Sequence, residues 1–129
     1  MLPFARARLS LAIGAVLAFS TVTPAPVLAA DPPYEKALLR LAEVLGSVHY
    51  LRNLCGEEGD AWRERMQTLI ETENPEPLRR ARLIASFNRG YRAFAAVHRN
   101  CTPNAIAALG GYMQEGAALS ADITNRYGN

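Results

Sequence analysis

Residues 38–55 read LLRLAEVLGSVHYLRNLC, an apolar pattern of helical period that ends at a cysteine. The apolar residues that recur every three or four positions would line one face of a helix. They are Leu38, Leu41, Leu45, Val48 and Leu51. Gly56 is typical of a residue that ends a helix in a left-handed conformation. The pattern therefore predicts a helix that follows Asp31-Pro32-Pro33, with Asp31 as a candidate cap, and ends near Leu54.

Helical spacing recurs in three later segments, and no segment alternates as a strand would. Asp60 is the candidate cap of the second helix, which runs to about Glu73. Two prolines in residues 74–77 end it, because proline does not fit a helix interior. A third helix is expected from about Pro77 to Asn100, and a fourth begins at Thr102-Pro103. The predicted fold class is all-α, a small bundle of about four helices.

Each of these later helices carries an apolar stripe that is expected to face the core. The stripes are Trp62, Met66, Leu69 and Ile70 in the second helix, Leu83, Phe87, Tyr91, Phe94 and Val97 in the third, and Ile106, Leu109, Met113, Leu119 and Ile123 in the fourth. Gly90 would let another helix approach closely. Gly110, Gly111 and Gly116 weaken the fourth helix and predict either a kink or a close helix contact.

Cys55 and Cys101 are the only two cysteines of the chain. Short loops make consecutive helices antiparallel, so these cysteines, each just after an odd-numbered helix, arrive at the same end of the bundle. The topology therefore permits a disulfide bond. The alternative is a metal site that adds His49 and His98, but the paired ligand spacing of zinc sites is missing, and we expect no metal and no cofactor.

The N-terminus has the features of a secretion signal. Arg6 and Arg8 precede an apolar run, Leu9 to Phe19, which is shorter than the roughly 20 residues needed to span a bilayer. Small residues predict cleavage after Ala29. Residues 1–29 are therefore the expected signal peptide, and 30–129 the expected single helical domain, periplasmic and without stable membrane insertion.

The charge of the expected mature chain is balanced. The sequence has 14 Lys and Arg against 12 Asp and Glu, and removing Arg6 and Arg8 leaves 12 of each sign. A neutral domain lacks the basic surface that nucleic acid binding requires. We therefore expect no nucleic acid partner.

Known catalytic motifs are missing. The chain has no G-x-S-x-G, no glycine-rich phosphate loop and no H-E-x-x-H. An acidic side chain, Glu64 or Glu115, could serve as the acid of a small envelope enzyme that cleaves glycan. We expect a protein that is not an enzyme, with this activity and metal binding through His49 and His98 as the alternatives.

Residues 87–94, FNRGYRAF, combine aromatic and arginine side chains, the types that are enriched at protein interfaces. The candidate interaction patch comprises Arg89, Arg92, Tyr91, Glu115 and Trp62. Glu115 is also the candidate ion-pair partner of one of these arginines. The patch would bind an unidentified protein of the cell envelope.

Several strings together resemble a family of small exported alphaproteobacterial proteins of unknown function. They are LGSVHYLR (45–52) with LCG (54–56), WR (62–63), FNRGYR (87–92), CT (101–102) and RYG (126–128). The resemblance covers about residues 44–128. It implies a periplasmic location and a Cys55–Cys101 disulfide, and it supplies no catalytic or ligand residues. The leading hypothesis is a non-enzymatic accessory or protein-interaction domain of the cell envelope.

Overall fold

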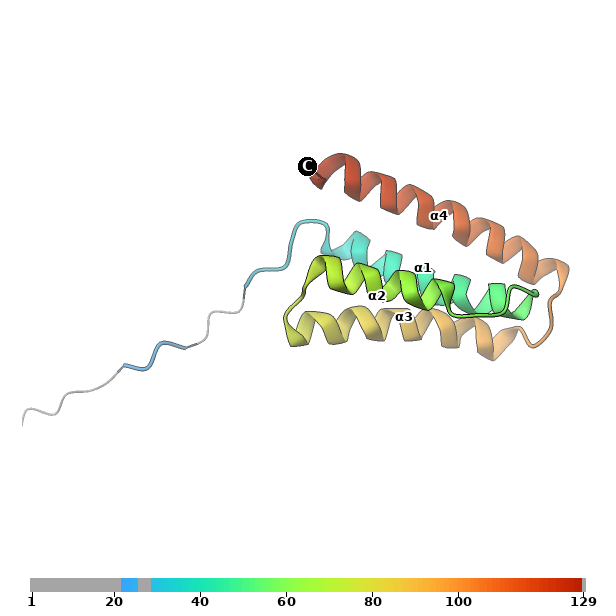
Figure 1. Ribbon diagram of the computed structural model, residues 1–129, viewed down its shortest axis with the longest axis horizontal. Coiled ribbons are helices and arrows are strands. Elements are labelled where there is room, and N and C mark those ends of the chain that lie inside the picture. The colour runs from blue at the N-terminus through green and yellow to red at the C-terminus, as the bar shows by residue number, and fades with distance from the viewer. Residues whose placement is uncertain (1–21, 26–28, 129) are drawn as a thin grey trace, which may run out of the picture.

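The computed structural model describes residues 22–25 and 29–128, and within them the chain forms four helices and no strand. The helices are α1 (Glu35–Leu54), α2 (Ala61–Glu73), α3 (Pro77–Val97) and α4 (Pro103–Tyr127). Helices α1 and α3 run in one direction, and α2 and α4 run in the other (Figure 1). The all-α prediction is confirmed. The predicted signal peptide lies largely outside the described residues.

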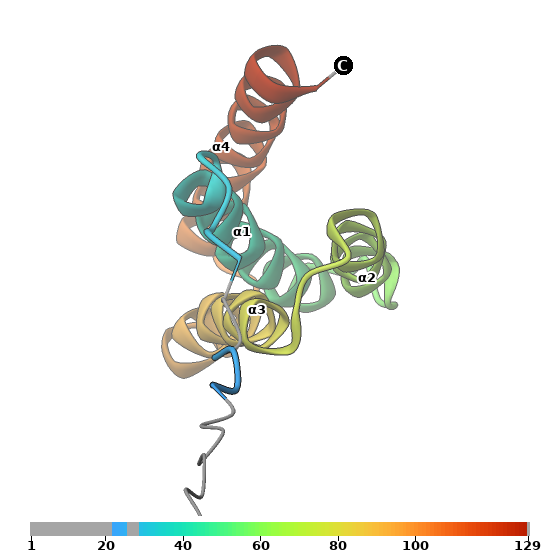
Figure 2. The same ribbon diagram turned by 90° about the vertical axis from the view of Figure 1, so that its left-hand side faces the viewer.

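Helix α1 is the centre of the structure. It contacts all three other helices, and its contact with α3 is the most extensive. Among the described helices, the backbone of α4 comes close only to that of α1, and the Phe94 ring of α3 meets the Tyr112 ring of α4 with 5.0 Å between the centroids. Helix α2 comes close to α3 at few points. In the end-on view, α2, α3 and α4 surround α1 (Figure 2). The helices therefore fan out from α1, and they do not close into a ring of four.

This central position buries α1 on several sides, whereas the sequence predicted one buried face. Leu38, Leu41, Val48 and Leu51 are buried as expected. Val44 is buried within the same stripe, and Ala42, Ser47 and His49 are buried on either side of it. A helix with three neighbours has little surface left for solvent, which explains the difference.

The core joins the first three helices, with α4 added at its edge. Its buried members are Leu38, Leu41, Ala42, Met66, Ile70, Leu83 and Phe87, and Leu119 and Ile123 of α4 pack against them. Two expected core residues are exposed: Val97 by 74% and Ile106 by 57%. Helix α3 ends at Val97 and not at Asn100, because residues 98–102 turn away to reach the disulfide.

Two glycines bring the backbones of α1 and α3 into contact. A Cβ atom placed on Gly46 would lie 1.9 Å from the carbonyl oxygen of Phe87. One placed on Gly90 would lie 2.0 Å from the carbonyl oxygen of Glu43. Neither position has room for a side chain, so the close approach predicted at Gly90 is confirmed, with Gly46 as its counterpart on α1.

The glycines of α4 behave differently. The helix is continuous through Gly110 and Gly111, and a Cβ atom at either residue would meet nothing within 4 Å. The expected close contact occurs only at Gly116, where a Cβ would lie 3.2 Å from a methyl group of Val44. Gly116 is therefore the point at which α4 approaches α1.

The helix ends follow the sequence in part. Thr102 caps α4, since its hydroxyl accepts a hydrogen bond from the backbone N–H of Ala105 at 3.1 Å, and Gly56 has a positive φ of 100° as expected. Asp31 does not cap α1, which begins at Glu35, and instead pairs with Arg82 at 2.6 Å. Asp60 precedes α2 but makes no capping hydrogen bond.

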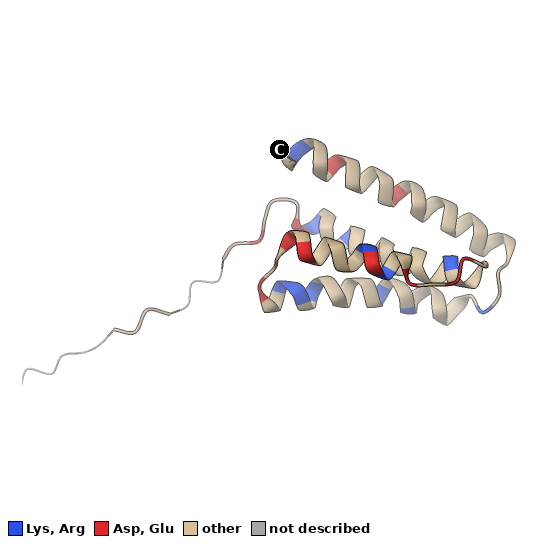
Figure 3. Cartoon of the chain, in the orientation of Figure 1, with Lys and Arg blue, Asp and Glu red and all other residues tan. Residues whose placement is uncertain are grey.

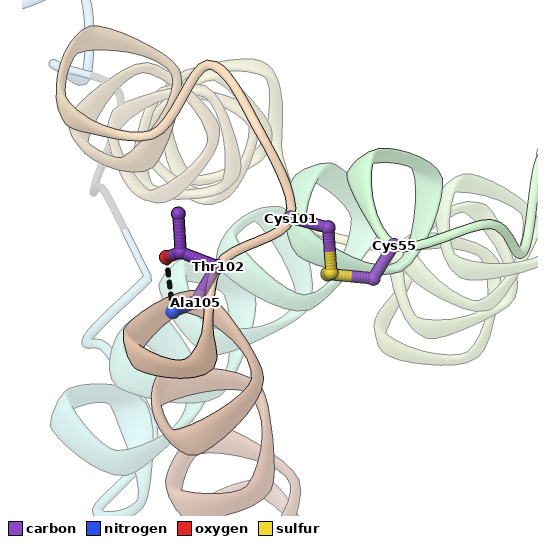
Figure 4. The surroundings of a disulfide bond; sticks show 4 residues. All are labelled: Cys55, Cys101, Thr102 and Ala105. Atoms are coloured by element: carbon purple, nitrogen blue, oxygen red, sulfur yellow. Dashed lines mark hydrogen bonds between the residues drawn. A yellow bond between two sulfur atoms is a disulfide. The ribbon is translucent and has the colours of Figure 1, made fainter.

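The disulfide joins Cys55 at the end of α1 to Cys101 just before α4, with 5.0 Å between the Cα atoms. Figure 4 shows the bond beside the capped start of α4. The bond and the shared end of α1 and α3 confirm the topology inferred from the sequence. It fixes the base of α4, a helix in which only Ala105 is buried.

A cluster of charges fixes the opposite end of the bundle. The Arg79 guanidinium lies 2.6 Å from the Glu35 carboxylate and 2.7 Å from that of Glu73. The three side chains come from α3, α1 and α2, and all are largely shielded from solvent. One arginine therefore ties together three helices where they meet.

We expect Gly46→Ala and Gly90→Ala each to lower the free energy of unfolding by about 3 kcal/mol, because the new methyl group forces α1 and α3 apart. Chemical denaturation followed by circular dichroism measures this. Gly110→Ala is the matched control and should stabilise the protein by up to about 1 kcal/mol, since nothing lies near it. Unchanged stability in the first two variants would contradict this account of the helix contact.

Removing the disulfide should also lower stability markedly. The bond closes a loop with a sequence separation of 46, and the chain-entropy model gives such a loop a stabilisation of roughly 4 kcal/mol. Thermal melts of Cys55→Ser/Cys101→Ser beside the parent, with and without reductant, measure the loss. The reduced parent should melt like the double variant; a double variant that melts like the oxidised parent refutes the prediction.

Candidate functional site

A groove lies between α2 and α4, with α1 as its floor. Its volume is about 820 Å³, within the range of roughly 300–1,000 Å³ that is usual for binding sites. Its lining comprises Leu41, Val44, Leu45 and Val48 of α1, Ala61, Trp62, Glu64, Arg65, Thr68, Leu69, Thr72 and Glu73 of α2, and Tyr112, Met113, Gly116, Ala117 and Ser120 of α4. We call this the α2–α4 groove.

The floor and the α4 wall are uncharged. The floor is aliphatic, from four residues of α1. The α4 wall is Tyr112 and Met113 followed by the small residues Gly116, Ala117 and Ser120, which share one face of the helix because of their spacing. Charged residues are sparse along α4 (Figure 3). This half of the groove offers apolar and small side chains to a ligand.

The α2 wall adds aromatic and charged groups. Trp62 lies near the start of α2, and two guanidinium groups lie over its indole ring, that of Arg65 at 4.8 Å and that of Arg52 at 5.9 Å from the ring centroid. The indole Nε1 is buried without a hydrogen-bond partner. Tryptophan and arginine are the residue types that dominate binding energy at interfaces. The start of α2 is therefore the most distinctive end of the groove.

A bidentate ion pair between α1 and α4 fixes the position of the α4 wall. Arg40 of α1 donates to Glu115 of α4 through Nε at 2.6 Å and Nη2 at 2.9 Å. This hydrogen bonding holds the pKa of the Glu115 carboxyl below its usual value of 4.5 and raises the pKa of Arg40. The Arg40 guanidinium also lies over the Tyr112 ring, 5.5 Å from its centroid. Arg40 thus orients two residues of α4 at once.

The residues of the predicted interaction patch do not share one surface. Of the five, Trp62 alone lines the groove. Arg89 pairs with Glu43 at 3.1 Å and Arg92 is exposed on α3. Tyr91 packs on the His49 and Tyr50 rings, with centroids 5.7 and 5.2 Å away. Glu115 pairs with Arg40, and the expected pairing with an arginine of α3 is wrong.

The two histidines are engaged in packing. His49 is buried and stacks near Phe87 and Tyr91, and burial holds its pKa below the usual value. His98 stacks on Phe94, and its carbonyl oxygen accepts a hydrogen bond from the Tyr50 hydroxyl. Both cysteines are oxidised. Among residues 22–25 and 29–128, no three or more potential ligand side chains gather to hold a metal ion.

The two candidate catalytic acids have different environments. Glu64 is exposed at the lip of the groove on α2. Glu115 is bound to Arg40, and its lowered pKa keeps the carboxylate ionised at neutral pH. A general acid must carry a proton near the working pH, so this environment acts against that role for Glu115.

Most of the groove could not be found from the sequence. Trp62 was assigned to the candidate interaction patch, but Val44 and Gly116 belong to the groove only because α4 crosses α1 at that point. The one available signal is the uncharged run from Pro103 to Gln114, unusual for a helix with so little burial. Such a run indicates a surface with another use than solvation.

No helix within the described ranges is both long enough and apolar enough to cross a membrane. The sequence model of a family described as "Protein of unknown function (DUF2385)" matches residues 33–127. No curated protein and no solved structure matches the chain significantly. The family match covers all four helices.

We expect the Arg40–Glu115 pair to make stability depend on pH. Because the pKa of Glu115 is lowered in the folded state, its contribution is complete above the usual value of 4.5 and is lost as the pH falls through the folded-state pKa. Arg40→Gln should cost up to about 1 kcal/mol at pH 7, as for other partly exposed pairs. Its difference from the parent should shrink in acid.

Urea unfolding between pH 3 and pH 7 measures this difference. The control is Arg126→Gln, which removes an exposed pair with Asp122 on α4 alone and should change stability by no more than a few tenths of a kcal/mol. A deficit of Arg40→Gln that stays constant across this pH range would refute the proposed linkage.

Proposed function

The chain belongs to a family of unknown function, DUF2385, and we propose that it is a non-enzymatic protein-interaction domain of the bacterial cell envelope, with the α2–α4 groove as its binding surface. The observation that carries this proposal is the groove itself. Its floor is apolar, it lies between α2 and α4, and Trp62 and Arg65, whose residue types are enriched at interfaces, stand at one end. A small domain that leaves such a surface uncovered is built to contact another molecule.

The periplasm is the proposed location. Support comes from the signal-like residues 1–29, from the resemblance to small exported alphaproteobacterial proteins, and from the disulfide, which persists in oxidising compartments. In this proposal Arg6 and Arg8 are removed with the signal peptide. The remaining domain then has 12 basic and 12 acidic residues.

The construction of the groove favours binding over catalysis. Its floor and α4 wall carry no ionisable group that is poised to donate or accept a proton, apart from the Tyr112 hydroxyl. Its acidic members, Glu64 and Glu73, both belong to α2, and Glu73 is engaged by Arg79 at 2.7 Å. Most glycoside hydrolases use two carboxyl groups that flank the scissile bond, which a single α2 wall does not supply.

In-cell photo-crosslinking tests the interaction directly. The full chain is expressed with a photoreactive phenylalanine analogue at Ala117, an exposed residue in the groove, or at Ala81, an exposed residue of α3 outside it. We expect the Ala117 position to give discrete protein adducts in the periplasmic fraction, and the Ala81 position to give none at comparable yield.

Equal adducts from both positions, or none from either, would contradict the proposal. A chain that remains in the cytoplasmic fraction with its N-terminus uncleaved would overturn the location. Release of soluble sugar from purified peptidoglycan, abolished by Glu64→Gln, would replace binding with the glycan-cleaving alternative.

A further inference from the structure

We propose that the α2–α4 groove holds an amphipathic helix of about three turns from a partner protein, with an acidic residue of that helix facing Arg65. This inference rests on the proposed function. It adds the conformation and the charge of the segment that binds.

The arrangement of the helices points to a helical occupant. In a closed four-helix bundle each helix contacts two neighbours. Here α2 and α4 both contact α1 but do not contact each other. A helix laid between α2 and α4, on the side away from α3, would complete a bundle of four with α1 (Figure 2). It would lie over the floor, where Val44 and Val48 are already buried, and it would cover the partly exposed side chains of Leu45, Leu69 and Met113.

The dimensions of the walls set the length of that helix. The α2 wall extends from Ala61 to Glu73, which at 1.5 Å per residue is about 18 Å, or about three turns. Its members Ala61, Arg65, Thr68 and Thr72 follow the four- and three-residue steps of one helical face. On the opposite wall, Gly116, Ala117 and Ser120 are small. Small residues let a helix approach closely, as they do between α1 and α3.

The charges of the groove define the orientation. Arg65 stands over Trp62 at one end and forms no salt bridge with any described residue. At the other end Glu73 is neutralised by Arg79. The free cation inside the groove is therefore Arg65, and a carboxylate on the bound helix would pair with it. Glu64 lies at the lip, where it disfavours further acidic residues.

Photo-crosslinking from both walls identifies the segment of the partner that the groove contacts. A photoreactive phenylalanine analogue is placed at Thr68 or at Ala117, one on each wall, in the full chain in cells. Adducts are digested, and the crosslinked segment of the partner is identified by mass spectrometry. We expect both positions to mark one segment of about 12 residues, with apolar residues at helical spacing and an acidic residue near the end that faces Arg65.

Charge reversal tests the predicted contact. Replacing a charge that has an opposite partner by one of like sign lowers affinity at least about tenfold, so Arg65→Glu should reduce the adduct yield by that factor. Arg63→Glu is the matched control, because Arg63 lies on α2 outside the groove and pairs weakly with Asp60 at 3.7 Å. Lysine in place of the partner's acidic residue should restore the yield with Arg65→Glu.

Each other outcome overturns the inference. A crosslinked segment without helical spacing, or an equal effect of Arg63→Glu and Arg65→Glu, refutes the helical occupant while the proposed function stands. An adduct at twice the mass of the chain shows that a second copy fills the groove, and an adduct with lipid shows an acyl ligand. Absence of groove-specific adducts from both positions removes the proposed function together with this inference.

Discussion

The structure depends on the contact between the backbones of α1 and α3. Gly46 and Gly90 lie against the carbonyl oxygens of Phe87 and Glu43, which leaves no space for any other residue. This contact makes α1 and α3 a rigid pair whose C-terminal ends meet at one end of the molecule. Everything else is attached to that pair: α2 through Met66 and Ile70, and α4 through the disulfide and residues of α1.

The groove lies beside α4, a helix in which only Ala105 is buried. Because α1 already packs closely against α3 and also contacts α2, α4 lies along the side of α1 that these two helices leave open (Figure 2). It is held there by Cys101 at its base, by Arg40 paired with Glu115, and by Gly116 against Val44. Leu119 and Ile123 add contacts at the edge of the core. Because α4 does not come close to α2, a groove remains between them, and binding sites are often drawn from such less densely packed regions. The sparse packing that leaves most of α4 unburied also leaves the α2–α4 groove accessible.

Sequence reasoning worked best where local chemistry decides the result. The four helices, the left-handed Gly56 and the Thr102 cap were all predicted, since apolar spacing and capping depend on neighbours in the chain. It worked less well for Asp31, which pairs with Arg82 instead of capping α1. The Asp31 carboxylate pairs with an arginine 51 residues away in the chain. Capping rules consider only neighbouring residues, so they cannot predict this pair.

The sequence by itself determined the helices, their antiparallel order and the shared end at which Cys55 meets Cys101, because spacing, loop length and thiol count constrain these directly. Only the tertiary structure decided which faces the helices present to one another. It separated Trp62 from Arg89, Arg92 and Tyr91, gave Glu115 to Arg40, and left the groove between α2 and α4. Those outcomes depend on the crossing of α4 over α1 and on side chains far apart in the chain, and a one-dimensional pattern carries no information on either.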